Sequence, residues 1–116
     1  MTDLSAEDRK LVTLARATRA RTGAAEGAAV RDENGRTYAA ATVDLPSLQV
    51  PAVGVCVAMA VASGSRGLEA AVVLTEGAEP AGIGAVRDLG GPDVVVHVGD
   101  PAGRAMRSGT AAAPPS

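Results

Sequence analysis

The sequence predicts a small α/β domain with a mixed sheet and helices packed on both faces of that sheet. Three observations predict it: a helical stripe of apolar residues near the start, a hairpin signal at Asn34-Gly35, and two aliphatic runs at 68–75 and 93–98 separated by a short helical segment. With 116 residues and a net charge of -2, the chain is long enough for one domain with a modest core.

A first helix is expected over residues 6–21. Ser5 and Asp8, three residues apart, form a loose capping box, and the apolar residues after them recur at helical spacing: Leu11, Leu14 and Ala15. Two short apolar stretches, at 27–31 and 37–43, then flank Asn34-Gly35. They are expected to pair as strands through a type I′ turn, because both of these turn residues tolerate positive φ.

A second helix is expected over 51–63, after a loop at 44–47. Pro51 suits the first turn, where its missing N–H costs nothing, and Gly64 suits the C-terminal cap. The alternating valines would also suit a strand, but the length and the Ala-rich spacing favour a helix. This helix has no polar face, so it needs cover on all sides. A second subunit is the expected cover, which predicts a homo-oligomer, dimer or tetramer, formed through the 51–63 helix.

The rest of the chain predicts strand, helix and strand. Residues 68–75 are expected to be a buried strand, 76–81 a loop, 83–89 a short helix and 93–98 a β-branched strand. The composition then turns to Gly, Ala, Pro and Ser. We therefore expect a domain over 1–100 and a disordered tail over 101–116, with a further short strand around 105–108 as the alternative.

Composition excludes several classes of function. The scattered charges and the single aromatic residue, Tyr38, argue against a nucleic-acid surface. The longest apolar run, 50–62, is shorter than the roughly 20 residues that span a bilayer, so no membrane segment is expected. The first residues are polar and acidic, unlike a signal peptide, and Cys56 has no partner for a disulfide. A cytoplasmic protein is the expectation.

Several short sequence segments, called words below, resemble in their order the small, homotetrameric type of cytidine deaminase. Each word is weak alone, but their order and spacing are shared over about residues 11–99. The matching words are Leu14-Ala15-Arg16-Ala17, Gly27-Ala28-Ala29-Val30, Ala60-Val61-Ala62-Ser63-Gly64, Ala70-Ala71-Val72-Val73-Leu74, Glu79-Pro80 and Val86-Arg87-Asp88-Leu89-Gly90. The resemblance implies a three-layer cytidine deaminase-like fold.

The zinc chemistry that this resemblance implies has no matching residues. The family opens its second helix with Cys or His and a Glu two residues later, and its third helix with Pro-Cys-x-x-Cys, which hold zinc and shuttle protons. Here Pro51 and Val53 stand at the first pair, or Val53 and Val55 in the alternative register. Pro80 is kept, but Ala81 and Gly84 replace the two cysteines. We therefore expect no zinc, no other cofactor and no catalytic residue set.

The substrate positions of the family are mostly changed as well. Ala24 stands where the family has an aromatic ring, and Ala20-Arg21-Thr22 where it has Pro-Tyr-Ser. The Asn-x-Glu pair that holds the ribose falls on Thr42 and Asp44, of which only Asp44 keeps a carboxylate. The scaffold words survive while the functional positions are lost, a pattern that fits a degenerate relative.

Other residues that could carry chemistry have simpler interpretations. Cys56 lies within the apolar helix and is expected to be a buried small hydrophobe. His97 is expected to be a strand histidine facing an edge, a loop or a subunit contact, since zinc needs about three protein ligands. Three loop acids could lie together at the mouth of the substrate cleft that the resemblance implies, although loop acids are usually solvated: Glu76, Glu79 and Asp44. No Ser-His-Asp order with a nucleophile elbow and no phosphate-binding glycine motif is present.

Three functions remain open at this point. The first is a non-catalytic cytidine deaminase-like protein that serves as an oligomeric scaffold or partner-binding module. The second is a nucleoside- or nucleotide-binding protein that keeps a remnant cleft. The third is a divergent nucleoside deaminase whose chemistry comes from residues outside the expected positions. The ligand-binding residues and the protein partner are not identified by the sequence.

Overall fold

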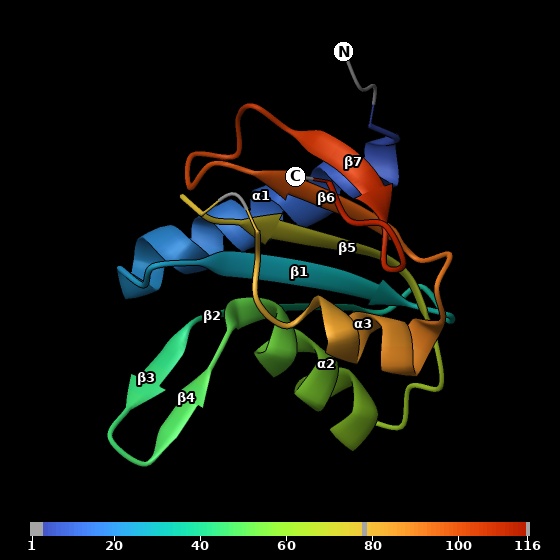
Figure 1. Cartoon of the computed structure of the whole chain (residues 1–116), viewed down its shortest axis with the longest axis horizontal. Helices are drawn as coiled ribbons and strands as arrows, with labels where there is room; N and C mark the ends of the chain where they lie inside the picture. The colour runs from blue at the N-terminus through green and yellow to red at the C-terminus, as the bar shows by residue number, and fades with distance from the viewer. Residues whose placement is uncertain (1–3, 78, 116) are drawn as a thin grey trace.

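The computed structural model describes residues 4–77 and 79–115 (Figure 1). Its helices and strands follow one another as α1 Ala6–Thr22, β1 Gly27–Asp32, β2 Thr37–Ala41, β3 Val43–Leu45, β4 Leu48–Val50, α2 Ala52–Ala62, β5 Leu68–Leu74, α3 Ile83–Gly90, β6 Val95–Gly99 and β7 Arg107–Thr110. The three predicted helices and the main predicted strands are confirmed, with ends that differ by a few residues.

The main sheet has five strands in the order β2-β1-β5-β6-β7. Only β5 and β6 run parallel, and the other neighbours are antiparallel, so the sheet is mixed as expected. Figure 1 shows α1 on one face and α2 with α3 on the other. The expected three-layer α/β fold is therefore confirmed.

Small side chains let the helices approach the sheet closely. On the α1 face, Leu11, Val12 and Ala15 pack against the β1 and β5 residues Ala29, Ala70, Val72 and Leu74. At Gly27 a Cβ atom would lie 2.3 Å from the Ala15 carbonyl oxygen, so only glycine fits there. On the other face, α2 and α3 pack over a core that includes Val30, Val73, Val96 and Val98.

The turn between β1 and β2 differs from the predicted type I′ turn. Among the described residues only Ala105 is a non-glycine with positive φ, so Asn34 is not in the left-handed region, whereas Gly35 has φ +82°. The Asp32 carboxylate accepts hydrogen bonds from the N–H groups of Asn34 and Arg36, both at 2.9 Å. This side chain holds a longer loop with one left-handed glycine, a known alternative hairpin form.

The segment 43–50 forms a second, separate hairpin. We expected a strand ending at residue 43 and a loop over 44–47, but β3 and β4 pair as a two-stranded sheet. Figure 1 shows this β3–β4 hairpin projecting beside α2. Its leucines are exposed, Leu45 by 55% and Leu48 by 53%. A three-residue strand of exposed leucine and acid carries no clear alternation, which is why the sequence did not predict it.

The expected disordered tail over 101–116 is wrong for its middle part. Residues 107–110 form β7, which pairs antiparallel with β6, close to the alternative strand around 105–108. Ala111 follows in a buried position, and its N–H donates to the Val94 carbonyl at 2.9 Å. Backbone pairing with β6 orders this Gly- and Ala-rich segment, although its composition has little strand propensity.

Candidate functional site

A hollow of about 450 Å³ lies where the β3–β4 hairpin meets the start of α2 and the end of the loop before α3. It is open to solvent, and the residues that line it are Glu26, Thr42, Val43, Asp44, Gln49, Val50, Pro51 and Ala81. Four of these correspond to positions that the resemblance assigned to the family's site: Thr42 and Asp44 for the ribose, Pro51 for the first zinc ligand and Ala81 for a cysteine. The fold thus brings these distant positions together in one hollow.

The first turn of α2 at this hollow carries only apolar side chains. Pro51 is the N-cap residue and makes no side-chain capping hydrogen bond. Gly82, with φ +95°, precedes α3, and a Cβ atom on it would lie 2.9 Å from Val53 Cγ1 and 3.0 Å from Pro51 Cγ. Val53 is fully buried. The space between the first turns of α2 and α3 is therefore filled by the Pro51 and Val53 side chains.

These residues do not fit a zinc ion. Zinc in proteins takes Cys, His or carboxylate ligands, and Pro51, Val53 and Ala81 offer none. The alternative register, Val53 and Val55, offers none either. Within residues 4–77 and 79–115, no three His, Cys, Asp or Glu side chains come together in a way that could hold a metal. The aliphatic packing at Gly82 also leaves no space for an ion between the two helices.

Glu26 is a polar residue of the hollow that the sequence analysis missed. Its Oε1 accepts a hydrogen bond from the Ala52 N–H at 3.4 Å, so the carboxylate caps α2 in place of the apolar N-cap Pro51. Its own N–H donates to Thr42 Oγ1 at 2.9 Å. The only sequence signal was an acid directly before a strand glycine, which points to no partner. With Asp44 and Gln49, Glu26 could hold a hydroxyl-rich or amine ligand.

Replacing Glu26 with glutamine is expected to lower the free energy of unfolding by about 0.5–1 kcal/mol, because the helix N-terminus loses a negative charge. Urea denaturation of both proteins measures it. Glu76, an exposed loop acid, provides the matched control, and Glu76→Gln should leave the unfolding midpoint unchanged. Equal midpoints for Glu26→Gln and wild type would show that the carboxylate does not stabilise α2.

Glu76, Glu79 and Asp44 do not gather in one hollow, which agrees with the simpler interpretation of solvated loop acids. Asp44 lines the hollow described above, whereas Glu76 lines a separate hollow with Arg19 and Glu79 a third one beside Ile83. Of these three acids, only Asp44 lines the hollow beside the β3–β4 hairpin.

Cys56 is the buried small hydrophobe that we expected. It lies on the buried face of α2, fully inside the core, and burial raises the pKa of its thiol to about 12. The thiol is therefore protonated at neutral pH and is a poor nucleophile or metal ligand.

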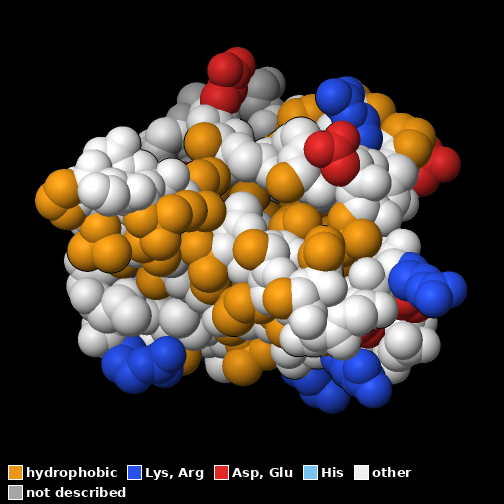
Figure 2. Space-filling view, turned by 90° about the horizontal axis from the view of Figure 1, so that it is seen from below, with side chains coloured by type: hydrophobic (Ala, Val, Ile, Leu, Met, Phe, Trp, Pro, Cys, Tyr) orange, Lys and Arg blue, Asp and Glu red, His pale blue; other side chains and the backbone are white. Residues whose placement is uncertain are grey.

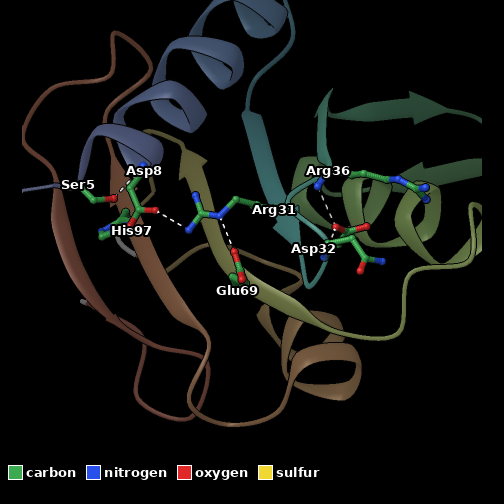
Figure 3. Close-up of polar contacts among 8 residues, drawn as sticks. Ser5, Asp8, Arg31, Asp32, Arg36, Glu69 and His97 are labelled. Carbon is green, nitrogen blue, oxygen red and sulfur yellow. Dashed lines mark hydrogen bonds and ion pairs between the residues drawn. The ribbon is translucent and has the colours of Figure 1, made fainter.

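The expectation of His97 at an edge, loop or subunit contact is wrong. His97 is only 4% exposed; it lies on β6 and contacts Asp8 in the first turn of α1. Its Nε2 is 2.7 Å from Asp8 Oδ2, and its Nδ1 is 2.6 Å from Ser108 Oγ. Figure 3 shows Asp8 between His97 and Arg31. A long separation in sequence, 89 residues from Asp8, hid this contact from pattern analysis.

Arg31 and Glu69 extend the network. Arg31 Nη2 is 3.0 Å from Asp8 Oδ1, and Arg31 Nε donates to Glu69 Oε1 at 2.8 Å. The contact with Asp8 is an ion pair rather than an aligned hydrogen bond, since Oδ1 has no hydrogen-bond partner among the described residues. Burial alone would raise the pKa of Asp8, but the contacts with His97 and with the Arg31 guanidinium outweigh it and lower that pKa. Asp8 is thus held as a carboxylate.

Comparison with known proteins places the fold. Residues 4–103 match the family model described as cytidine deaminase-like. Cytidine deaminase from Burkholderia pseudomallei is similar in structure, with a TM-score of 0.74, 23% identity and coverage of 93% of this chain and 94% of that chain. Cytidine deaminase from Mycobacterium leprae has a TM-score of 0.69 and 22% identity, with coverage of 95% of this chain and 96% of that chain. Cytidine deaminase from Bacillus anthracis has a TM-score of 0.67 and 17% identity, with coverage of 90% of this chain and 83% of that chain.

A comparison with curated protein sequences found no match. None of the described helices is long and apolar enough to cross a membrane. The solved structures, all below 25% identity, establish the shared fold, while the family model covers most of the chain. The sheet order, the helix placement and the family match agree with the resemblance seen in the sequence. The chain belongs to the cytidine deaminase-like family.

Proposed function

We propose that this chain is a cytidine deaminase-like protein that does not deaminate and that serves as an oligomeric scaffold or partner-binding module. The observation that carries this proposal is the aliphatic filling between α2 and α3: Pro51 and Val53 occupy the place where zinc and a proton-shuttling carboxylate would act. Proline and valine can neither bind a metal nor transfer a proton. Without both groups, most of a deaminase's rate enhancement would be lost.

The outer face of α2 supports the oligomeric part of the proposal. Residues 52–62 carry no charged or polar side chain, and Val61 on the outer face is 54% exposed. Leu45 and Leu48 of the β3–β4 hairpin are also exposed. Figure 2 shows hydrophobic side chains spread over this side of the molecule, with the charged side chains toward its rim. An apolar surface of this kind is typical of a subunit contact.

A second candidate function is nucleoside binding, which the polar lining of the hollow favours. Thr42, Asp44 and Gln49 offer a hydroxyl, a carboxylate and an amide beside the Glu26 carboxylate. These groups suit the hydroxyls of a ribose, although the aromatic ring of the family is Ala24 here. A divergent nucleoside deaminase is the third candidate, and it would need catalytic groups from a partner chain. We also propose a cytoplasmic location, which the unpaired Cys56 supports.

Native mass spectrometry with metal analysis and a cytidine deamination assay on the same sample tests the proposal. We expect a dimer or tetramer without stoichiometric zinc and with no release of ammonia from cytidine, even after zinc is added. Stoichiometric zinc together with turnover of cytidine would overturn it. A thermal shift with nucleosides, lost in Asp44→Ala, would instead establish the second candidate.

A further inference from the structure

Ser108, His97 and Asp8 form a hydrogen-bonded chain on the α1 face of the sheet. Ser108 Oγ is 2.6 Å from His97 Nδ1, and His97 Nε2 is 2.7 Å from Asp8 Oδ2. The histidine and the aspartate are buried, whereas Ser108 on β7 is exposed. A hydroxyl within hydrogen-bond reach of a base that a third group orients is the arrangement that activates a nucleophile.

The direction of each hydrogen bond follows from Asp8. An ionised carboxylate only accepts hydrogen bonds, so the proton shared with it must be on His97 Nε2. In the neutral imidazole, Nδ1 then carries a lone pair and accepts. In this neutral form of His97, the Ser108 hydroxyl donates its proton to Nδ1. Arg31, 3.0 Å from the other Asp8 oxygen, fixes the carboxylate in this position.

The strand ladder explains why Ser108 reaches the ring and what its backbone does. The Ala111 N–H donates to the Val94 carbonyl, so residues 94 and 111 form a hydrogen-bonded pair. Along antiparallel strands such as β6 and β7, hydrogen-bonded and non-hydrogen-bonded pairs of facing residues alternate. His97 and Ser108 are thus a non-hydrogen-bonded pair, in which side chains lie closer together. The Ser108 N–H then points away from β6, toward the open edge of the sheet, since β7 is the last strand.

That N–H is available to a ligand. Within residues 4–77 and 79–115 it has no hydrogen-bond acceptor, whereas the next outward-facing N–H, of Thr110, donates to the Ala113 carbonyl. In serine hydrolases of the trypsin type, the N–H of the nucleophilic serine is one of the donors that stabilise the oxyanion. Ser108 therefore combines an activated hydroxyl with a free backbone donor, both at the solvent-exposed edge.

We propose that Ser108 is a nucleophile for acyl transfer and that the chain slowly hydrolyses small carboxylic esters. Ser108 Oγ bonds to the ester carbonyl carbon while its proton moves to His97 Nδ1. The bond to the alcohol oxygen then breaks, and the alcohol leaves with that proton. A water molecule next gives a proton to Nδ1 and bonds to the acyl carbon. The carboxylic acid forms as Ser108 Oγ leaves and takes the proton back.

Asp8 is a positioning residue in this reaction, since it acts only through His97. Ser108 lines none of the five hollows of about 280–730 Å³ on the described surface, so we expect a small acyl group and little selectivity for the alcohol. The site lies on the α1 face of the sheet, opposite the face that α2 and α3 cover. It is therefore independent of the proposed loss of deamination, and each proposal can fail without the other.

The test is incubation of the full chain with p-nitrophenyl acetate, followed by nitrophenol release and by peptide mass spectrometry. We expect an acetyl group on Ser108, trapped at low pH, and no acetylation at this position in Ser108→Ala. Ser47, exposed in the β3–β4 turn, provides the matched control, and Ser47→Ala should keep the full rate. Lys10 reports unspecific acetylation, which should be equal in all variants.

A second variant separates catalysis from a structural role. His97→Gln should slow Ser108 acetylation by at least about 100-fold, the low end of general-base contributions. If this variant does not fold, labelling of wild type and Ser108→Ala by a fluorophosphonate probe decides instead, because only an activated serine reacts. Absence of acyl or phosphonyl adduct on Ser108, or equal rates in wild type and Ser108→Ala, would overturn the proposal and leave the chain of hydrogen bonds as a structural tether of α1.

Discussion

Replacing Val61 with aspartate is expected to convert the assembled protein to a monomer while the fold is kept. Val61 is 54% exposed on the outer face of α2, where a second subunit is the proposed cover. Burying an unpaired carboxylate in such a contact costs several kcal/mol. A cost of about 3 kcal/mol corresponds to a dissociation constant more than about 100-fold higher. Native mass spectrometry and sedimentation at micromolar protein measure the change in mass.

The control for this experiment lies on the opposite face. Leu14 is 38% exposed on α1, and Leu14→Asp should leave the assembly intact. Val57, also on α2, is a poor test because it is only 7% exposed and belongs to the core, so an aspartate there would unfold the chain. A Val61→Asp protein with the mass of the wild-type assembly would show that the outer face of α2 is not the contact.

The fold was predictable because its elements carry local signals. The apolar 51–63 stretch bracketed by Pro51 and Gly64, and the aliphatic run at 68–75, each indicate one element without knowledge of the rest. The proposed absence of a zinc site rests on residue type alone, since a ligand needs a particular residue type at a particular position. Pro51 and Ala81 cannot coordinate in any conformation.

The features that could not be predicted depend on contacts between distant parts of the chain. Strand β7 is held by pairing with β6 and not by its own composition. Asp8 and His97 are 89 positions apart, and nothing near either residue announces the other. Glu26 and Asp32 read as ordinary surface acids, yet Glu26 accepts a hydrogen bond from the Ala52 N–H and Asp32 accepts one from Ser65 Oγ, each more than 20 positions away. The roles of such polar residues depend on tertiary contacts, which the local sequence does not indicate.

Replacing Asp32 with alanine is expected to lower the free energy of unfolding by about 3 kcal/mol, because hydrogen bonds to charged groups contribute roughly 1.5–3 kcal/mol each and are not additive. Asp32 is fully buried. One carboxylate oxygen accepts from the Asn34 and Arg36 N–H groups, and the other accepts from Ser65 Oγ at 2.6 Å. Figure 3 shows Asp32 beside Arg36. The residue thus ties the β1–β2 turn to the loop after α2.

Asp32 should also make the free energy of unfolding depend on pH in the acidic range. Burial alone would raise the pKa of Asp32, but the hydrogen bonds from Ser65, Arg36 and Asn34 outweigh it and lower that pKa. A carboxyl group whose pKa is lower in the folded state stabilises fully above its unfolded pKa of about 3.9, and this contribution is lost as the pH falls through the folded value. Asp8, whose pKa is also lowered, should contribute in the same direction.

Urea denaturation of wild type and Asp32→Asn from pH 7 down to about pH 2, below the reference pKa of aspartate, separates these effects. The variant should be less stable at neutral pH. It should also lose less stability on acidification, because the carboxyl group of Asp32, whose pKa is lowered in the folded state, is gone and only that of Asp8 still contributes. Asp93, an exposed aspartate before β6, is the control, and Asp93→Asn should follow the wild-type curve. Parallel curves for wild type and Asp32→Asn across this range would mean that Asp32 does not stabilise the fold as a carboxylate, and its three hydrogen bonds would then be worth no more than those of a neutral amide.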